Sequence, residues 1–206
     1  MGLHERRERE REQRREQILD AARELLLEKG YYHISMRQIA TLAELGVGTI
    51  YSYFKSKEDI YADLSTDVFD QLYDAMRKAA DGAASPPEKI RGIANALLDF
   101  SSDHRMYYDF LDYFISTPRT IFPPEMKERV DYHGNRILEP VAEAIRQGMA
   151  SGQFRQVSPE RHALIFFGSV HGFLHFRKLQ DTVLRNDNFN EMYNETIECF
   201  INGLKV

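Results

Sequence analysis

Apolar residues recur at the spacing of amphipathic α-helices along most of this 206-residue chain. A first segment ends at Gly30, and its apolar face carries Ile18, Ala22, Leu25 and Leu26. A second segment starts at Ser56, an N-cap before an acidic first turn, and extends to about Ala80. Its apolar positions are Ile60, Leu64, Val68, Leu72 and Met76. Both segments indicate helices with one buried face.

The rest of the chain continues this pattern. Further segments with helical features lie at residues 87–100, 106–115, 123–150, 159–178 and 189–204. Within the third of these, Pro140 lacks an amide donor and predicts a kink or break near Leu138. Ser158 reads as the N-cap of the fourth, which is the most apolar. The pattern therefore predicts an all-α fold.

The stretch between residues 35 and 57 predicts two short helices joined by a tight turn. Ser35 and Gln38 can form a capping box that starts a helix running to about Ala43. Its apolar positions are Ile39 and Leu42. After a break at residues 44–46, a second helix should turn Val47, Ile50 and Phe54 inward and leave Thr49, Ser52 and Tyr53 outside, with Tyr51 to one flank. A helix of this size, held by a scaffold, suits the major groove of DNA.

The run TIYSYFKSKED at residues 49–59 closely resembles the recognition-helix signature of the TetR family of bacterial repressors. The resemblance covers residues 16–64 in detail and the remainder only in its layout of helices. It implies about nine helices, with a helix-turn-helix DNA-binding domain at 1–56 and an effector-binding and dimerisation domain at 57–206. It also implies that the last two helices, at 159–178 and 189–204, form a homodimer interface.

Two residues depart from the family's pattern in the turn. Glu44 takes the position of a glycine, so either the turn is tilted or Glu44 adopts a left-handed conformation. Gly46 stands where a serine would cap the next helix.

The family's motif, followed position by position, implies contacts with a palindromic operator. Phosphates should be bound by Thr49, Tyr51, Tyr53 and Lys57, and bases read by Arg37, Gln38 and Val47. The full set of expected DNA-binding residues is Ser35, Arg37, Gln38, Gly46, Val47, Thr49, Tyr51, Tyr53, Lys55 and Lys57.

Charge is unevenly distributed along the chain. The net charge is −5, yet residues 1–60 hold 11 basic and 11 acidic side chains, so the whole deficit lies in the rest. A neutral head and an acidic body fit a protein that presents one end to DNA. The mixed-charge run at residues 3–16 has two interpretations. It is a solvated helix held by Glu/Arg pairs, or its arginines Arg6, Arg7, Arg9 and Arg11 lie along DNA phosphates or in a minor groove.

Aromatic residues concentrate in the body of the protein, with 13 Phe and 11 Tyr in the chain. They either fill a core or, because hydroxyl groups need partners, line a pocket for a small apolar or aromatic effector. The candidate pocket residues are Tyr107, Tyr108, Tyr113, Phe167, His171 and His175. Two functions follow: a repressor released by an effector, or a DNA-binding adaptor of the same fold whose body recruits a protein partner.

Enzyme motifs are missing from the sequence: it has no G-x-S-x-G elbow, no phosphate-binding loop and no C-x-x-C pair. His171 and His175 have the spacing of a zinc-binding pair, but Gly172 replaces the catalytic Glu, so no cofactor or metal is expected. The single Cys199 excludes an internal disulfide and is interpreted as a small core residue. With no membrane segment or apolar leader in the sequence, a cytoplasmic protein is expected.

Overall fold

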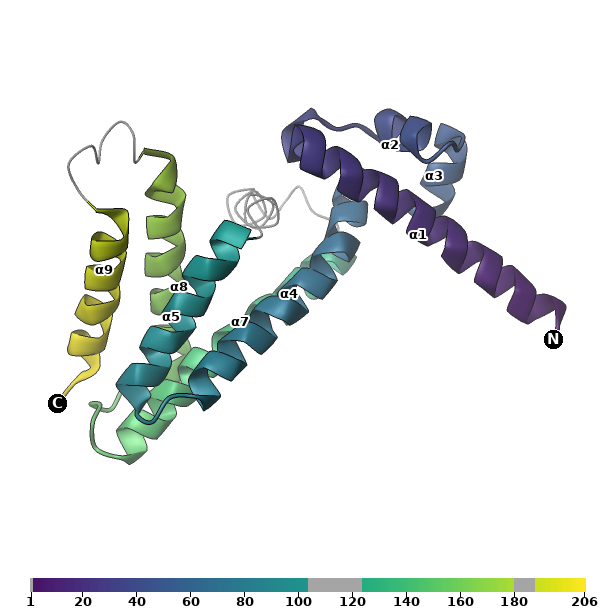
Figure 1. Cartoon of the computed structure of the whole chain (residues 1–206). Coiled ribbons are helices and arrows are strands. Elements are labelled where there is room, and N and C mark those ends of the chain that lie inside the picture. Colours follow the sequence, from purple (N-terminus) through teal and green to yellow (C-terminus); the bar gives the residue numbers. More distant parts are fainter. Residues whose placement is uncertain (1, 104–123, 180–187) are drawn as a thin grey trace. The chain divides into compact units, whose positions relative to one another are not determined.

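The computed structural model describes residues 2–103, 124–179 and 188–206, and over these ranges the chain is built from helices (Figure 1). The α-helices are α1 (Leu3–Lys29), α2 (Met36–Leu42), α3 (Val47–Tyr53), α4 (Lys57–Asp81), α5 (Pro86–Asp103), α7 (Pro124–Ala150), α8 (Pro159–His175) and α9 (Phe189–Leu204). Short 3-10 turns η1 (Tyr31–His33) and η3 (Phe176–Leu179) follow α1 and α8. The predicted all-α fold is confirmed. None of the described helices is long and apolar enough to cross a bilayer.

Two compact units make up the chain, and their boundary along α4 falls between Val68 and Phe69. The first unit contains α1, α2, α3 and the first turns of α4, with the start of α7. The second contains the rest of α4 and α7 together with α5, α8 and α9. The domain boundary expected after residue 56 stays a prediction.

The first unit is held by one apolar core to which each of its four main helices contributes. Its fully buried side chains include Ile18, Ala22, Ile39, Ile50 and Ile60. The predicted inward face of α1 is therefore confirmed. Leu42, which was expected on the inward face of α2, is instead 39% exposed because it lies in the last turn, past the core.

Helix α1 begins much earlier than the apolar pattern alone would place it. Its side chains from His4 to Arg14 are exposed, and charge pairs support this part, such as Arg6 Nε to Glu10 Oε1 at 2.9 Å. The mixed-charge run is therefore an exposed helix supported by a Glu/Arg pair, and contact of its arginines with DNA stays a prediction.

In the second unit α5 packs against both α8 and α9 (Figure 1). The buried Tyr193 hydroxyl on α9 donates a hydrogen bond to the Ala94 carbonyl oxygen on α5 at 2.6 Å. Burial raises the pKa of Tyr193 well above its usual value. Arg91 on α5 also binds both carboxylate oxygens of Glu198 on α9 and thereby lowers the pKa of that carboxyl. These bonds fix α9 against α5.

Helix α7 runs through Pro140 without interruption, so a break near Leu138 is wrong, and the alternative of a kink there stays a prediction. Pro140 itself is buried. The buried side chains Ile137, Val141 and Ile145 lie on both sides of it and pack the helix along its length. Tertiary packing therefore outweighs the loss of one backbone hydrogen bond.

The turn after α7 depends on close contact between Gly148 and Phe154. The amides of Gln153 and Phe154 both donate to the Gly148 carbonyl, at 2.9 and 3.0 Å, and Gly152 supplies the left-handed conformation with φ 70°. The Phe154 ring is only 1% exposed, and a Cβ at Gly148 would overlap it.

We therefore expect Gly148→Ala to destabilise the protein by about 1–3 kcal/mol, because the ring cannot leave its site without exposing apolar surface. Urea unfolding measures the change. Gly134→Ala on the same helix is the matched control, since a Cβ there has nothing within 4 Å, and it should be neutral or stabilising by up to about 1 kcal/mol. Equal stabilities of the two variants would contradict the packing argument.

Cys199 is exposed on α9, so its interpretation as a core residue is wrong. The helix buries the face that contains Tyr193, Ile197 and Ile201, and Cys199 lies off that face. It lines a surface groove of about 480 Å³ between α8 and α9, together with Ile165 and Phe200.

Candidate DNA-binding surface and effector groove

Helix α2 starts with the capping box that the sequence predicts. The Ser35 hydroxyl accepts from the Gln38 amide at 3.3 Å, and the Gln38 side chain accepts from the Ser35 amide at 2.9 Å. Arg37, the second residue of α2, is exposed. The cap therefore fixes the start of α2 next to the exposed Arg37 side chain.

The turn between α2 and α3 places a non-glycine residue in a left-handed conformation. Glu44 has φ 53°, which decides between the two alternatives left by the sequence. The Leu45 amide donates to Ala40 at 2.9 Å, and the Gln17 side chain donates to the Ala43 carbonyl at 2.8 Å. These bonds stabilise a conformation that costs an ordinary residue about 1–2 kcal/mol. Gly46 caps α3 without a side-chain bond.

Helix α3 has one buried and one exposed side. Ile50 and Phe54 are buried in the apolar core of the first unit (the head core), at 0% and 2% exposure, as predicted. Val47 was expected on the same inward stripe, but it is 38% exposed because it lies in the first turn, before the helix meets the core. An exposed Val47 is compatible with its other expected role, reading bases.

The residues expected to bind phosphates differ in the solvent exposure of their side chains. Tyr51 is 54% exposed and Lys55 is exposed, whereas Thr49 and Tyr53 are half-buried and Tyr53 packs against the head core. Lys57 is also half-buried, and its Nζ donates to the Ile34 carbonyl at 3.3 Å. One end of α4 is therefore tied to the segment that precedes α2.

Arg15 on α1 contacts both α4 and the residue that follows α3. The Arg15 guanidinium binds the Asp63 carboxylate of α4 and lies 5.4 Å from the centroid of the Phe54 ring, next to the end of α3. The Asp63 side chain is 13% exposed, so water screens this pair less than a surface pair. The recognition helix is therefore fixed relative to its neighbours at its C-terminal end.

Of the six residues expected to line an effector pocket, Tyr107, Tyr108 and Tyr113 lie outside the described residues. The other three are on α8. Phe167 and His171 are half-buried, and His175 is exposed with its ring edge against Phe176. In the described ranges, no three His, Cys, Asp or Glu side chains gather as metal ligands would.

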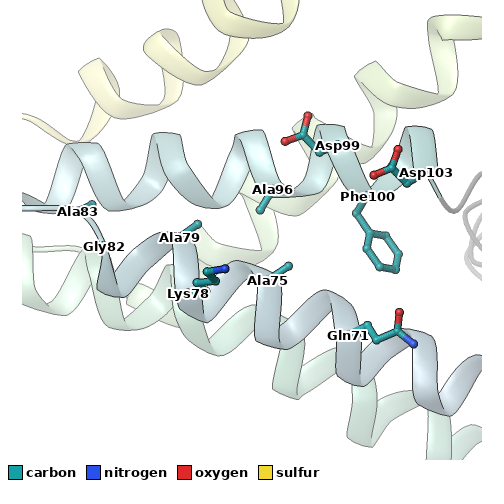
Figure 2. Close-up of a pocket in the computed structure, with 10 residues that line it drawn as sticks. All are labelled: Gln71, Ala75, Lys78, Ala79, Gly82, Ala83, Ala96, Asp99, Phe100 and Asp103. Carbon is teal, nitrogen blue, oxygen red and sulfur yellow. The ribbon is translucent and has the colours of Figure 1, made fainter.

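A groove of about 620 Å³ lies between α4 and α5 (Figure 2). Its floor is made of small residues, and the Phe100 ring points from α5 toward α4. The lining residues are Gln71, Ala75, Lys78, Ala79, Gly82, Ala83, Ala96, Asp99, Phe100 and Asp103. Of the expected pocket residues that the structure describes, Phe167, His171 and His175 are not among them. The signal available in the sequence was small residues alone: Ala75 and Ala79 lie four residues apart on α4, and Gly82 and Ala83 follow its end.

Comparisons with known proteins agree with this architecture. Residues 18–64 match the model for the family described as bacterial regulatory proteins, tetR family. The HTH-type transcriptional regulator YhgD of Bacillus subtilis is 28% identical over 156 residues, which cover 74% of this chain and 78% of that protein. The HTH-type transcriptional repressor KstR2 of Mycolicibacterium smegmatis is 26% identical over 147 residues, covering 69% and 68%.

The fold also matches a solved structure, the transcriptional regulator FadR from Bacillus subtilis in complex with stearoyl-CoA. The TM-score is 0.71 at 21% identity, with 91% of this chain and 98% of that chain covered. The matched helix-turn-helix segment and the shared fold together lead to one conclusion. The helix-turn-helix segment at residues 18–64 is of the type found in the TetR family of bacterial regulatory proteins, and the relatives that match over most of the chain are transcriptional regulators.

Proposed function

We propose that this protein is a cytoplasmic repressor that binds an inverted-repeat operator as a two-fold homodimer and is released by a small, largely apolar effector. The observation that carries the proposal is the capped helix-turn-helix with its exposed side. Arg37, Val47, Tyr51 and Lys55 are all exposed there, while Ile50 and Phe54 hold the helix to its core. A rigid short helix with polar and aromatic groups outward is suited to a major groove.

We expect Lys57→Ala to lower the slope of log K against log salt by about one unit for every DNA sequence, because one phosphate contact releases about one counterion. Fluorescence anisotropy at several salt concentrations measures the slope. Lys29→Ala, an exposed lysine in the same unit, is the matched control and should leave it unchanged. A Lys57→Ala slope equal to wild type would remove the phosphate role.

Arg37→Ala separates base reading from phosphate binding. If Arg37 reads a base, the variant loses about 1–3 kcal/mol against the preferred sequence and less against others, so its specificity relaxes. An equal loss on all duplexes would show instead that Arg37 binds only the backbone.

The apolar surface of α8 and α9 supports the homodimer. Leu164 and Ile165 on α8 are 62% and 48% exposed, and Ile165 borders the groove that contains Cys199. A Cβ built at Gly168 or at Gly172 would have nothing within 4 Å, so both glycines leave room for a second copy to approach. A two-fold axis through this surface would give the operator two half-sites.

The groove between α4 and α5 supports an effector site. It is bounded by α4, and α4 continues without a break to Lys57 at the edge of the DNA-binding unit. FadR of Bacillus subtilis was solved with stearoyl-CoA, which is consistent with an effector that carries an apolar chain. A ligand that separates α4 from α5 would move a helix whose first turns belong to the DNA-binding unit.

The adaptor function, in which the body recruits a protein, predicts a different response. An adaptor needs no effector, so apolar ligands would leave its operator affinity unchanged. Titration of apolar ligands with and without operator DNA therefore distinguishes the two functions.

A further inference from the structure

The projecting part of α1, its exposed residues 4–14, carries four arginines that bind no other described residue of the protein. Among the described residues, Arg7, Arg9, Arg11 and Arg14 make no ion pair or hydrogen bond, although glutamates alternate with them. Arg6 differs, since it is paired with Glu10. Four unpaired guanidinium groups lie on one exposed helix of a chain whose net charge is −5.

Three of these four arginines share one face of the helix. At about 100° per residue, Arg7 and Arg11 lie within about 20° of Ile18 around the axis, and Arg14 within about 40°. Ile18 is fully buried in the head core, so the arginines extend the inward face of α1 beyond the core. We call Arg7, Arg11 and Arg14 the basic stripe.

The glutamates lie off this face. Glu5, Glu8, Glu12 and Glu16 lie about 80–160° from Ile18 on one side of the axis, and Glu10 lies about 80° from it on the other. This arrangement places like charges four residues apart, at Arg7 and Arg11 and again along the glutamates. Like charges at this spacing destabilise an isolated helix by about 0.2–0.5 kcal/mol per pair. Helix stability alone would favour mixing the charges rather than separating them.

The basic stripe leads away from the expected phosphate contacts. Arg15, the next basic residue along α1, lies over the Phe54 ring, and Lys55 follows Phe54 directly. Lys57 completes this end of the unit. Basic side chains thus follow one another from the end of α3 to the projecting part of α1 within one compact unit, although Arg15 among them is paired with Asp63.

We propose that Arg7, Arg11 and Arg14 bind backbone phosphates of the operator, beside those bound from α3 and α4. The inference rests on the proposed DNA-binding function. The stripe spans roughly 10 Å along the helix, and phosphates are the polyanion that an unpaired row of guanidinium groups of this length suits. Arg6 and Arg9 lie about 120° and 180° from Ile18 and take no part.

Two double variants with the same change in net charge test the stripe. The probe is an inverted-repeat duplex that the wild-type protein selects from a pool of random duplexes, and anisotropy gives the salt slope. Arg7→Gln/Arg11→Gln should lower the slope by about two units, since each phosphate contact contributes about 0.9. Arg6→Gln/Arg9→Gln should change it by less than about half a unit, and far-UV circular dichroism should show equal helicity for both.

The outcomes separate this inference from the function beneath it. Equal slope losses in the two double variants would mean that only overall charge matters, and no loss in either would remove the DNA contact. If the stripe variant kept its slope but lost assembly of several dimers on one duplex, the stripe would bind the glutamate face of another copy instead. A wild-type protein that selects no inverted repeat would overturn the proposed function itself.

Discussion

Gly172→Arg should convert the homodimer into monomers and lower operator affinity by about a hundredfold or more. The expected cause is a long cation placed on the apolar surface of α8, where the partner's same helix would have to desolvate it. Loss of the second reading head removes the gain from linking two binding modules, which is about 10²–10⁴. Light scattering and operator titration measure the two effects.

The fold of the single chain should survive this change, because a Cβ at Gly172 has nothing within 4 Å. Gly134→Arg on α7 is the matched control, since that glycine is exposed and equally unobstructed, and it should remain dimeric. Leu164→Glu, at a side chain that is 62% exposed, gives a second test of the same surface. A dimer that persists in both Gly172→Arg and Leu164→Glu would place the contact elsewhere.

An apolar effector should weaken operator binding by about 5–150-fold, which corresponds to a coupling free energy of about 1–3 kcal/mol. Thermodynamic linkage requires that operator DNA weaken effector binding by the same factor. The measurement is a pair of titrations for each ligand of a fatty-acyl and aromatic series, with and without the selected operator. Ligands that bind equally in both cases would eliminate release by an effector and favour the adaptor function.

Filling the groove between α4 and α5 locates the effector. Ala96→Phe should abolish the response to effector and keep operator affinity, because the new ring occupies the space beside Phe100. Asn95→Phe, the exposed neighbour that does not line the groove, is the control. If Phe167→Ala or His171→Ala removed the response and Ala96→Phe did not, the effector would bind at the α8 position that the sequence predicts.

The sequence was most informative where structure depends on neighbours in the chain. The capping box at Ser35 and the N-cap at Ser158 are short-range signals, and both appear as predicted. The left-handed Glu44 was one of two alternatives, because a sequence shows an unusual residue in a turn but not how the turn accommodates it. Local signals therefore predicted the starts of α2 and α8 and narrowed the conformation of the turn before α3.

The sequence was less informative where a side chain's environment depends on packing between distant segments. Val47 and Cys199 both lie in apolar patterns, yet Val47 lies before the turn of α3 that meets the core and Cys199 lies off the buried face of α9. The groove between α4 and α5 is formed by alanines and glycine, whose importance lies in the space they leave. Hydrophobic periodicity predicts which side chains fill a core, but it does not predict where a groove is left empty.

The unbroken length of α4 has a mechanical consequence. Its 25 residues make a rod of roughly 37 Å, at a rise of about 1.5 Å per residue. A tilt of about 5° about one end moves the other by roughly 3 Å, close to the 3.4 Å rise of one base pair. Under the proposed function, a ligand at the level of Ala79 therefore needs to tilt α4 only slightly to displace Lys57, 22 residues away on the same helix, by about one base-pair step.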